Sequence, residues 1–115
     1  MAIAELYSGQ ETALSTTEWD LPTDTSSLSA ITTDGIYQVF LDVSDMVAGD
    51  VLRIRLYEKC RSGDTQRIAE EWTLSGTQSK PIWVSPSVIL IHGWTFTITA
   101  TAGTISVNWS VRQVA

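Results

Sequence analysis

His92 and Cys60 are the residues of this chain best suited to catalysis, and each residue type occurs once in 115 residues. A histidine that acts as a general base needs a positioned nucleophile or carboxylate, and the segment Ile91–Trp94 offers no recognisable partner. Cys60 stands between Lys59 and Arg61, whose positive charges favour a thiolate. Its place at the end of an alternating segment is nevertheless more typical of a structural thiol. We therefore predict that the protein is not an enzyme and has no catalytic residue.

The candidate metal ligands are three carboxylates, Asp42, Asp45 and Asp50. Oxygen ligands at this spacing can hold Ca²⁺, but the segment DVSDMVAGD lacks the alternating acidic pattern of a calcium loop. Ser44 or Asp45 can instead cap a single helical turn that Gly49 closes. The glycines of the chain are scattered and form no phosphate-binding loop. The sequence therefore predicts no metal and no cofactor.

The net charge of −6 argues against nucleic acid as a partner, because phosphate binding needs a clustered positive field. The longest apolar run, Val88–Ile91, is too short to cross a bilayer, so we expect no membrane partner. Residues 1–7 lack the basic start and the long apolar run of a signal peptide. Cys60 alone cannot form an internal disulfide. These features predict a protein that stays in the cytosol or in a particle assembled there.

The segment Val51–Leu74 carries the clearest structural pattern in the chain. Its first limb alternates apolar and polar residues, the turn RSGD follows, and a second limb returns. Such a pattern is typical of a half-buried β-hairpin. Pairing the limbs about the turn sets Leu52 opposite Leu74 and Ile54 opposite Trp72 on one face. A shift by one residue would expose an apolar row, so the pattern selects this register.

Basic residues cluster on the other face of the same hairpin and are interleaved with glutamates. The register that buries the apolar row also sets Arg55 opposite Glu71. We therefore predict that Arg53, Arg55 and Glu71 take part in cross-strand ion pairing. Any remaining charge would suit contact with a protein better than contact with a polynucleotide.

Segments 36–43, 94–99 and 105–111 repeat the period-2 pattern. Both faces of 36–43 are largely apolar, which predicts a central strand covered on both sides. The other two segments predict a last hairpin that turns at 101–103, with threonines opposite serine and asparagine on a polar outer face. The sequence thus predicts an all-β fold, either an antiparallel β-sandwich or a jelly-roll-like barrel.

Residues 1–33 precede these strands, and most of this segment is rich in serine and threonine. Residues 2–7 can add an edge strand, and the polar residues after Pro22 indicate a surface loop. The alternative is an extended N-terminal arm that orders on a neighbouring molecule. We divide the chain into this arm, edge strand and loop at 1–33 and a β-sandwich at 34–115, within one structural domain. The expected contact residues of the arm are Trp19, Leu21, Leu28 and Ile31.

Five tryptophans raise a carbohydrate-binding alternative, since sugar rings stack on exposed aromatic faces. Trp94 and Trp109 alternate with polar residues, and Trp72 belongs to the apolar face of the hairpin, so these three are expected in the core. Trp19 and Trp83 have no such assignment. They are the candidate residues of a glycan-binding β module.

The stretch 34–67 resembles a group of small proteins encoded among the head genes of tailed bacteriophages. The shared pattern is DGIYQ at 34–38, LDVSDM at 41–46, AGD at 48–50, RIRLYEK at 53–59, a turn at Gly63 and TQR at 65–67. Residues 1–33 carry no shared motif. These proteins are similar to capsid cement, or decoration, proteins, which are β-rich domains on the outer shell.

This resemblance implies a non-enzymatic virion structural protein that binds the outer shell and stabilises contacts between capsomers. A protein that binds only the assembled shell stabilises it by mass action. The resemblance also implies the major capsid protein as a partner, a homo-oligomer (a trimer or a dimer), and a place on the capsid surface of a virion assembled in the host cytoplasm. A phage tail or head-completion protein and a glycan-binding module are the alternatives.

Overall fold

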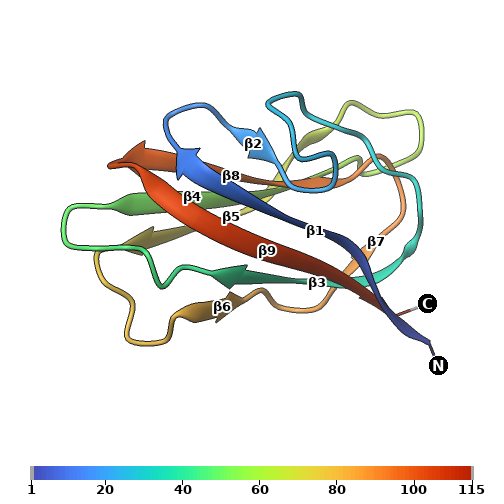
Figure 1. The fold of residues 1–115 in the computed structure, drawn as a ribbon. Helices are drawn as coiled ribbons and strands as arrows, with labels where there is room; N and C mark the ends of the chain where they lie inside the picture. The colour runs from blue at the N-terminus through green and yellow to red at the C-terminus, as the bar shows by residue number, and fades with distance from the viewer. Residues whose placement is uncertain (1, 115) are drawn as a thin grey trace.

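Nine β-strands make up the fold of residues 2–114, the part of the chain that the computed structural model describes (Figure 1). They are β1 (Ile3–Leu14), β2 (Trp19–Asp20), β3 (Gly35–Asp42), β4 (Val51–Glu58), β5 (Arg67–Ser75), β6 (Ile82–Val84), β7 (Val88–Leu90), β8 (Thr95–Ala102) and β9 (Ile105–Val114). Among these residues there is no helix that is long and apolar enough to span a membrane. The predicted all-β class is confirmed.

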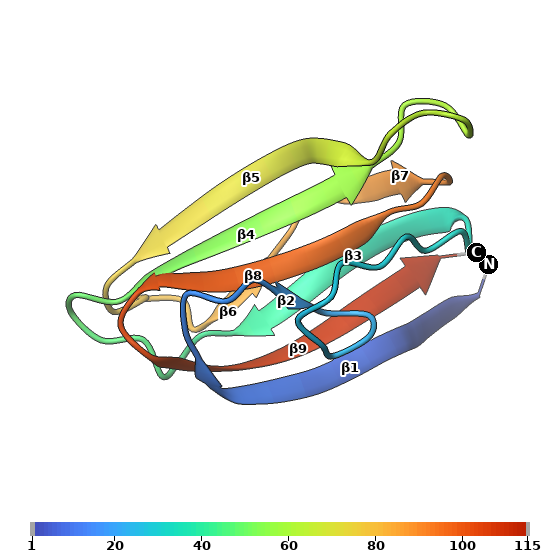
Figure 2. The ribbon, with the colours of Figure 1, turned by 90° about the horizontal axis from the view of Figure 1, so that it is seen from above.

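The strands form two antiparallel sheets that pack face to face, as the view from above shows (Figure 2). The first sheet has the strand order β1-β9-β3-β6, and β7 pairs with the part of β3 that β6 leaves free. The second sheet has the order β2-β8-β4-β5. Two stacked sheets that enclose one core confirm the predicted β-sandwich.

The hairpin of β4 and β5 has the register that the sequence predicts. Leu52 pairs with Leu74 and Ile54 with Trp72. β8 pairs with the other side of β4, so the apolar row of β4 lies in the middle of the second sheet. Leu52 and Ile54 are fully buried. A shift of the register by one residue would expose both, so their burial fixes the register.

The core is centred on the fully buried ring of Trp94. Its centroid lies 4.3 Å from that of Tyr37, 6.0 Å from that of Phe96 and 6.4 Å from that of Tyr7. Its indole N–H donates a hydrogen bond of 3.0 Å to the carbonyl oxygen of Thr33. Buried aromatic pairs stabilise by about 0.5–1.5 kcal/mol each beyond their buried area. Trp94 therefore joins rings from both sheets, as its predicted place in the core requires.

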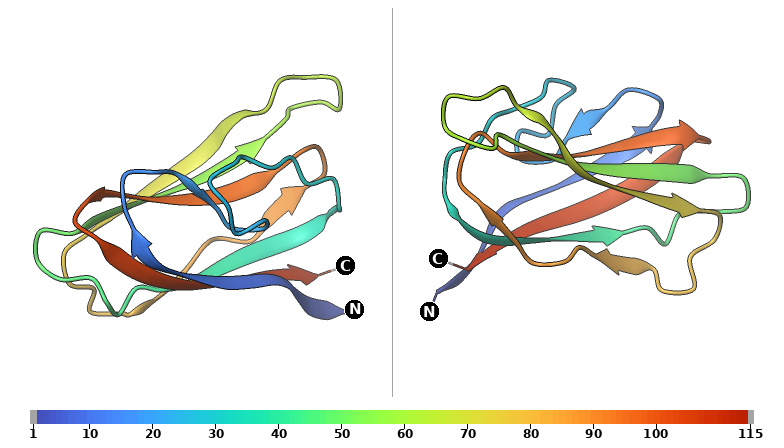
Figure 3. Two further views of the ribbon diagram at one scale, coloured as in Figure 1. Left: turned by 45° about the horizontal axis from the view of Figure 1, so that its top comes forward. Right: turned by 180° about the vertical axis from the view of Figure 1, so that it is seen from behind.

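The predicted last hairpin is wrong, because β8 and β9 belong to different sheets. The chain crosses at 103–104 from the second sheet to the first, as the two views in Figure 3 allow the reader to follow. Both strands point their apolar residues into the same core, but from opposite layers. The threonines of β8 and the serines and asparagine of β9 consequently lie on opposite outer faces of the sandwich.

The prediction that 36–43 is covered on both sides is also corrected. One face of β3 points into the core, where Tyr37, Val39 and Leu41 are fully buried. The other face points outward, and no element of residues 2–114 packs over it: Ile36 is 42 % exposed and Phe40 is half-buried. The outer side of β3 thus carries apolar side chains that residues 2–114 do not cover.

The residues expected as an extended N-terminal arm are built into the sandwich instead. Ile3–Leu14 forms the edge strand β1, which pairs with β9 along its whole length, so the predicted edge strand is present and longer than residues 2–7. Trp19–Asp20 forms β2 on the edge of the second sheet. Leu14 and Leu21 are buried in the core. Backbone pairing and apolar burial therefore hold this segment against the rest of the chain.

Gly9 on β1 makes room for the indole of Trp109, which faces the core as predicted. A Cβ atom on Gly9 would lie 2.5 Å from Cζ2 of Trp109. The indole cannot turn aside freely, because it is 4 % exposed and its Nε1 donates a hydrogen bond of 3.1 Å to the carbonyl oxygen of Leu21. The close approach of β1 to the core thus depends on a glycine at this position.

We expect Gly9→Ala to lower the free energy of unfolding by about 1–3 kcal/mol, the usual cost of overpacking a core. Gly63→Ala is the matched control, since a Cβ atom on Gly63 meets nothing within 4 Å. Urea denaturation followed by tryptophan fluorescence measures both. Equal midpoints for the two variants would contradict this account of Gly9.

Candidate functional site

The outer face of β8, within the second sheet, is covered by the chain itself. The threonine row of β8, which consists of Thr95, Thr97 and Thr99, is 0 %, 1 % and 3 % exposed. Residues 15–34, which we call the covering segment, run along β8, and Leu21 N donates to the carbonyl oxygen of Phe96 at 3.0 Å. The polar outer face predicted for the threonines is therefore buried rather than solvated.

Asp20 fastens the covering segment to the threonine row. Its side chain is buried, with the residue 1 % exposed, and it accepts hydrogen bonds from the backbone N–H and hydroxyl groups of Thr23 and Ser29 and from the hydroxyl of Thr95. A buried carboxylate is unfavourable unless such donors surround it. The five donors come from three places in the chain, so Asp20 holds the loop closed and attaches it to the sheet.

Glu18 makes a second attachment one strand further across the sheet. It accepts hydrogen bonds from the hydroxyls of Tyr57, at 2.7 Å, and Thr97. Burial and the bond to Glu18 raise the pKa of Tyr57 above its usual range. The hydroxyl of Tyr57 also accepts a long bond of 3.5 Å from Nη1 of Arg55. A continuous polar network thus connects the covering segment to the β4–β5 hairpin.

Of the predicted ion-pairing residues of the hairpin, Arg55 and Glu71 form a pair, and Arg53 forms none among the described residues. Nε of Arg55 lies 2.6 Å from Oε1 of Glu71, as the register requires, and this bond raises the pKa of the guanidinium. Both side chains are partly exposed, so the pair contributes little, about 0–1 kcal/mol. Arg53 lies opposite Thr73 and Thr99, and its Nε is buried without a hydrogen-bond partner among the described residues.

The predicted contact residues of the N-terminal segment have different surroundings. Leu21 is 1 % exposed in the core and has no free surface for a partner. Trp19 and Ile31 are half-buried and pack against the core. Leu28 is 49 % exposed on the loop of the covering segment. Contact of these residues with another molecule stays a prediction, and Leu28 is the one best placed to make it.

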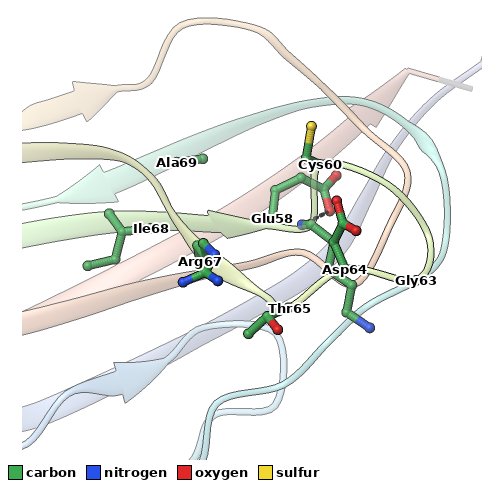
Figure 4. Close-up of a pocket in the computed structure, with 9 residues that line it drawn as sticks. Glu58, Cys60, Gly63, Asp64, Thr65, Arg67, Ile68 and Ala69 are labelled. Atoms are coloured by element: carbon green, nitrogen blue, oxygen red, sulfur yellow. Dashed lines mark hydrogen bonds between the residues drawn. The ribbon is translucent and has the colours of Figure 1, made fainter.

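A hollow of about 560 Å³ lies at the tip of the β4–β5 hairpin. Figure 4 shows the side chains that line it, from the end of β4, the turn and the start of β5. The carboxylate of Glu58 is engaged at its edge: it accepts bonds from the backbone N–H groups of Lys59, Ile91 and His92 at 2.9, 2.9 and 3.2 Å. Glu58 thus ties the hairpin to the loop before β8.

The two residues best suited to catalysis lie near this hollow. Cys60 lines it as an exposed free thiol. His92 does not line it but bonds through its backbone to two residues that do: its carbonyl oxygen accepts from Lys59 N at 3.1 Å, and its N–H donates to Glu58. The carboxylate of Glu58, which stands two residues before Cys60 and bonds to the N–H of His92, is therefore occupied by backbone amides.

The acidic residues at the end of β3 and in the loop that follows it make separate bonds. Asp42 accepts from the N–H of Ser44 at 3.0 Å, and hydrogen bonds from the side chain and then the backbone of Ser44 lower the pKa of its carboxyl group. Asp45 accepts from Ser106 N at 2.8 Å, and Asp50 accepts from Val47 N at 3.0 Å. The predicted helical turn is absent from residues 43–50, which form two tight turns. Residues 2–114 contain no group of three or more side chains arranged as metal ligands.

Sequence reasoning did not single out Glu18 and Asp20, which hold the covering segment. The alternation of polar and apolar residues at 18–20 could have indicated their role. Glu18, Trp19 and Asp20 alternate polar, apolar and polar, which is the period of a strand, and the threonines of β8 share that period. Two acceptors in alternation facing a row of hydroxyl donors would have predicted this pairing.

No family model matches the chain, and no curated protein matches it in sequence. Solved structures with a similar fold include the crystal structure of PirA, with a TM-score of 0.56 and 10 % identity over 91 % of this chain and 93 % of PirA. The vertex protein P5 of PRD1 has a TM-score of 0.53 and 8 % identity over the full length of both chains.

An enzyme shares the fold as well. The epimerase RmlC from Legionella pneumophila Philadelphia 1 matches with a TM-score of 0.50 and 5 % identity. The match covers all of this chain and 52 % of the epimerase, so the chain spans about half the length of that enzyme. One fold that serves a vertex protein and an epimerase does not assign a function by itself.

We expect Asp20→Ala to lower the free energy of unfolding by about 2–4 kcal/mol, because it leaves the donors of half-buried Ser29 and buried Thr95 without this acceptor. Hydrogen exchange should accelerate at the amides of Leu21 and Ile31, which bond to β8 and the residue before it. The exposed Asp34→Ala is the control and should change stability by less than about 0.5 kcal/mol. Unchanged exchange at Leu21 and Ile31 would refute the fastening role of Asp20.

We expect stability to fall as the pH rises from about 10 to about 12. Burial, followed by the nearby Tyr7, raises the pKa of Tyr37 from 10.0 to about 12. In this range an unfolded tyrosine loses its proton while folded Tyr37 keeps it, so the unfolded state binds fewer protons and is favoured. Urea midpoints at several pH values measure the slope, and Tyr37→Phe should make it shallower. Equal slopes in both proteins would assign the effect to other groups.

Proposed function

We propose that this chain is a non-enzymatic structural protein of a tailed-phage virion, a decoration protein that binds the outer shell and stabilises contacts between capsomers. The observation that supports this best is the similarity of its fold to the PRD1 vertex protein P5 along the whole of both chains. The resemblance of residues 34–67 to phage head proteins supports it independently. In this role the protein sits on the capsid surface of a virion assembled in the host cytoplasm.

The polar chemistry of the chain fits a structural role. Glu18, Asp20 and Glu58 are occupied by hydroxyl and backbone donors of the chain itself. Such bonds stabilise loops on a scaffold, as binding surfaces require. The major capsid protein is the partner that this proposal names, and no nucleic acid or membrane is involved.

The surface that we assign to the shell is the loop of the covering segment. Leu28 projects from it with 49 % of its surface exposed, next to the polar residues of the loop. An isolated apolar side chain within a polar rim is the composition of a small protein contact. Asp20 holds the loop on the second sheet, so Leu28 is presented in a fixed position.

We expect purified virions to contain the protein, and capsids that lack it to bind it in co-sedimentation. Leu28→Glu should weaken this binding by about tenfold or more, because it places a charge in an apolar contact. Val47→Glu, at an exposed valine with 59 % of its surface accessible, is the matched control and should bind normally. Mass spectrometry that finds no copy of the protein in virions would refute the proposal.

A glycan-binding role is the second candidate, and one feature favours it. Trp19 lines a hollow of about 220 Å³ together with Glu11, Ser15, Thr17 and Ser26. An aromatic ring beside hydroxyl and carboxylate groups suits a sugar. Trp83 is less suitable, because its ring packs against that of Trp72, with the centroids 5.4 Å apart. Specific sugar binding on a glycan array that Trp19→Ala removes would favour this role over the decoration role.

A further inference from the structure

The outer face of the first sheet carries an aliphatic row that crosses four strands. The registers place Ile3 of β1 beside Val114 of β9, Val114 beside Ile36 of β3, and Ile36 beside Ile89 of β7. Ile3, Ile36 and Ile89 are 69 %, 42 % and 77 % exposed. Four adjacent aliphatic side chains on one line form an apolar surface of the kind that protein contacts use.

A second apolar group lies on the same face, four residues further along β3. Phe40 of β3 pairs with Val84 of β6, which is 43 % exposed. The guanidinium of Arg112 lies over the ring of Phe40, 3.7 Å from its centroid. Hollows of about 220 and 350 Å³ lie on either side of this stack. The face therefore has both projecting aliphatic side chains and hollows that can receive them.

The charges on this face also come in both signs. Glu5 and Arg112 are paired positions on β1 and β9, and Asp42 lies on the outer side of β3. Glu5 and Arg112 both bond to the hydroxyl of Ser110, and neither forms an ion pair with another described residue. A surface with both signs and little net charge is self-complementary, whereas a strongly charged partner needs a field of one sign.

The size of the face suits a dimer. Four strands spaced by about 4.8 Å, with about eight residues rising about 3.4 Å each, give a projected area of roughly 500 Å². The accessible area of such a corrugated surface is larger than its projection. A standard interface removes about 800 Å² from each partner.

We propose that a second copy of this chain docks on this face, so that the two first sheets pack outer face to outer face about a two-fold axis. In such a dimer the same patch serves both copies, which is why projections, hollows and both charge signs occur together. The first sheet of the other copy would then cover the outer side of β3. Both faces of β3 would be buried, as the apolar composition of both faces favours. The dimer does not rest on the capsid role, because the surface assigned to the shell belongs to the second sheet.

Sedimentation velocity of the purified chain tests the dimer. We expect a concentration-dependent equilibrium between monomer and dimer with a Kd between about 1 and 100 μM. Ile89→Glu should raise this Kd at least tenfold, and Ile3→Glu is a second variant with the same expected result. Ile68→Glu on β5 of the second sheet, at a residue 48 % exposed, is the matched control and should leave the Kd unchanged. Urea midpoints establish that each variant is folded.

Three outcomes would overturn the dimer. A wild-type chain that stays monomeric at about 1 mM has no such interface. A trimer, or a dimer that Ile68→Glu disrupts and Ile89→Glu does not, uses another surface. If the wild-type chain is monomeric and Ile89→Glu abolishes capsid binding, the face binds the shell protein instead of a second copy. Because sedimentation uses the purified chain alone, a failed dimer and a failed capsid role are told apart.

Discussion

The packing of Trp94 is the interaction on which the rest of the structure depends. Its ring contacts aromatic rings of both sheets, and its indole N–H holds the carbonyl of Thr33 at the end of the covering segment. Its backbone exchanges two hydrogen bonds with Ile31. One residue therefore sets the distance between the layers and the position of the loop that lies over the second. Loss of this ring would disturb the core and the candidate contact surface together.

The alternation of apolar and polar residues predicted correctly which side chains of a strand face the core. The hairpin register followed from the pattern alone, because only one pairing buries Leu52 and Ile54 together. The core positions of Trp94 and Trp109 followed from the same rule. The pair of Arg55 with Glu71 then came from the register without further assumption.

What alternation cannot reveal is which layer a strand joins and what covers its second face. β8 and β9 both alternate, and the pattern is the same whether they pair in one sheet or face each other across a core. The threonine row was predicted as an outer face, but the covering segment alternates only over Glu18–Asp20, and its attachment depends on these two carboxylates. The candidate contact residues were misjudged for this reason: Leu21 supplies the core, and Leu28 remains at the surface.

The pairing of Ile3 with Val114 has a consequence for how the chain can be reconnected. These residues are neighbours on β1 and β9, so the two strands begin and end at the same corner of the sandwich (Figure 1). A short linker between them, with a new opening at the exposed turn around Gly63, would give a circular permutant with every strand pairing of the sandwich retained. In that permutant β1 would directly follow β9 in sequence, which converts the longest-range pairing of the fold into a local one and should accelerate folding.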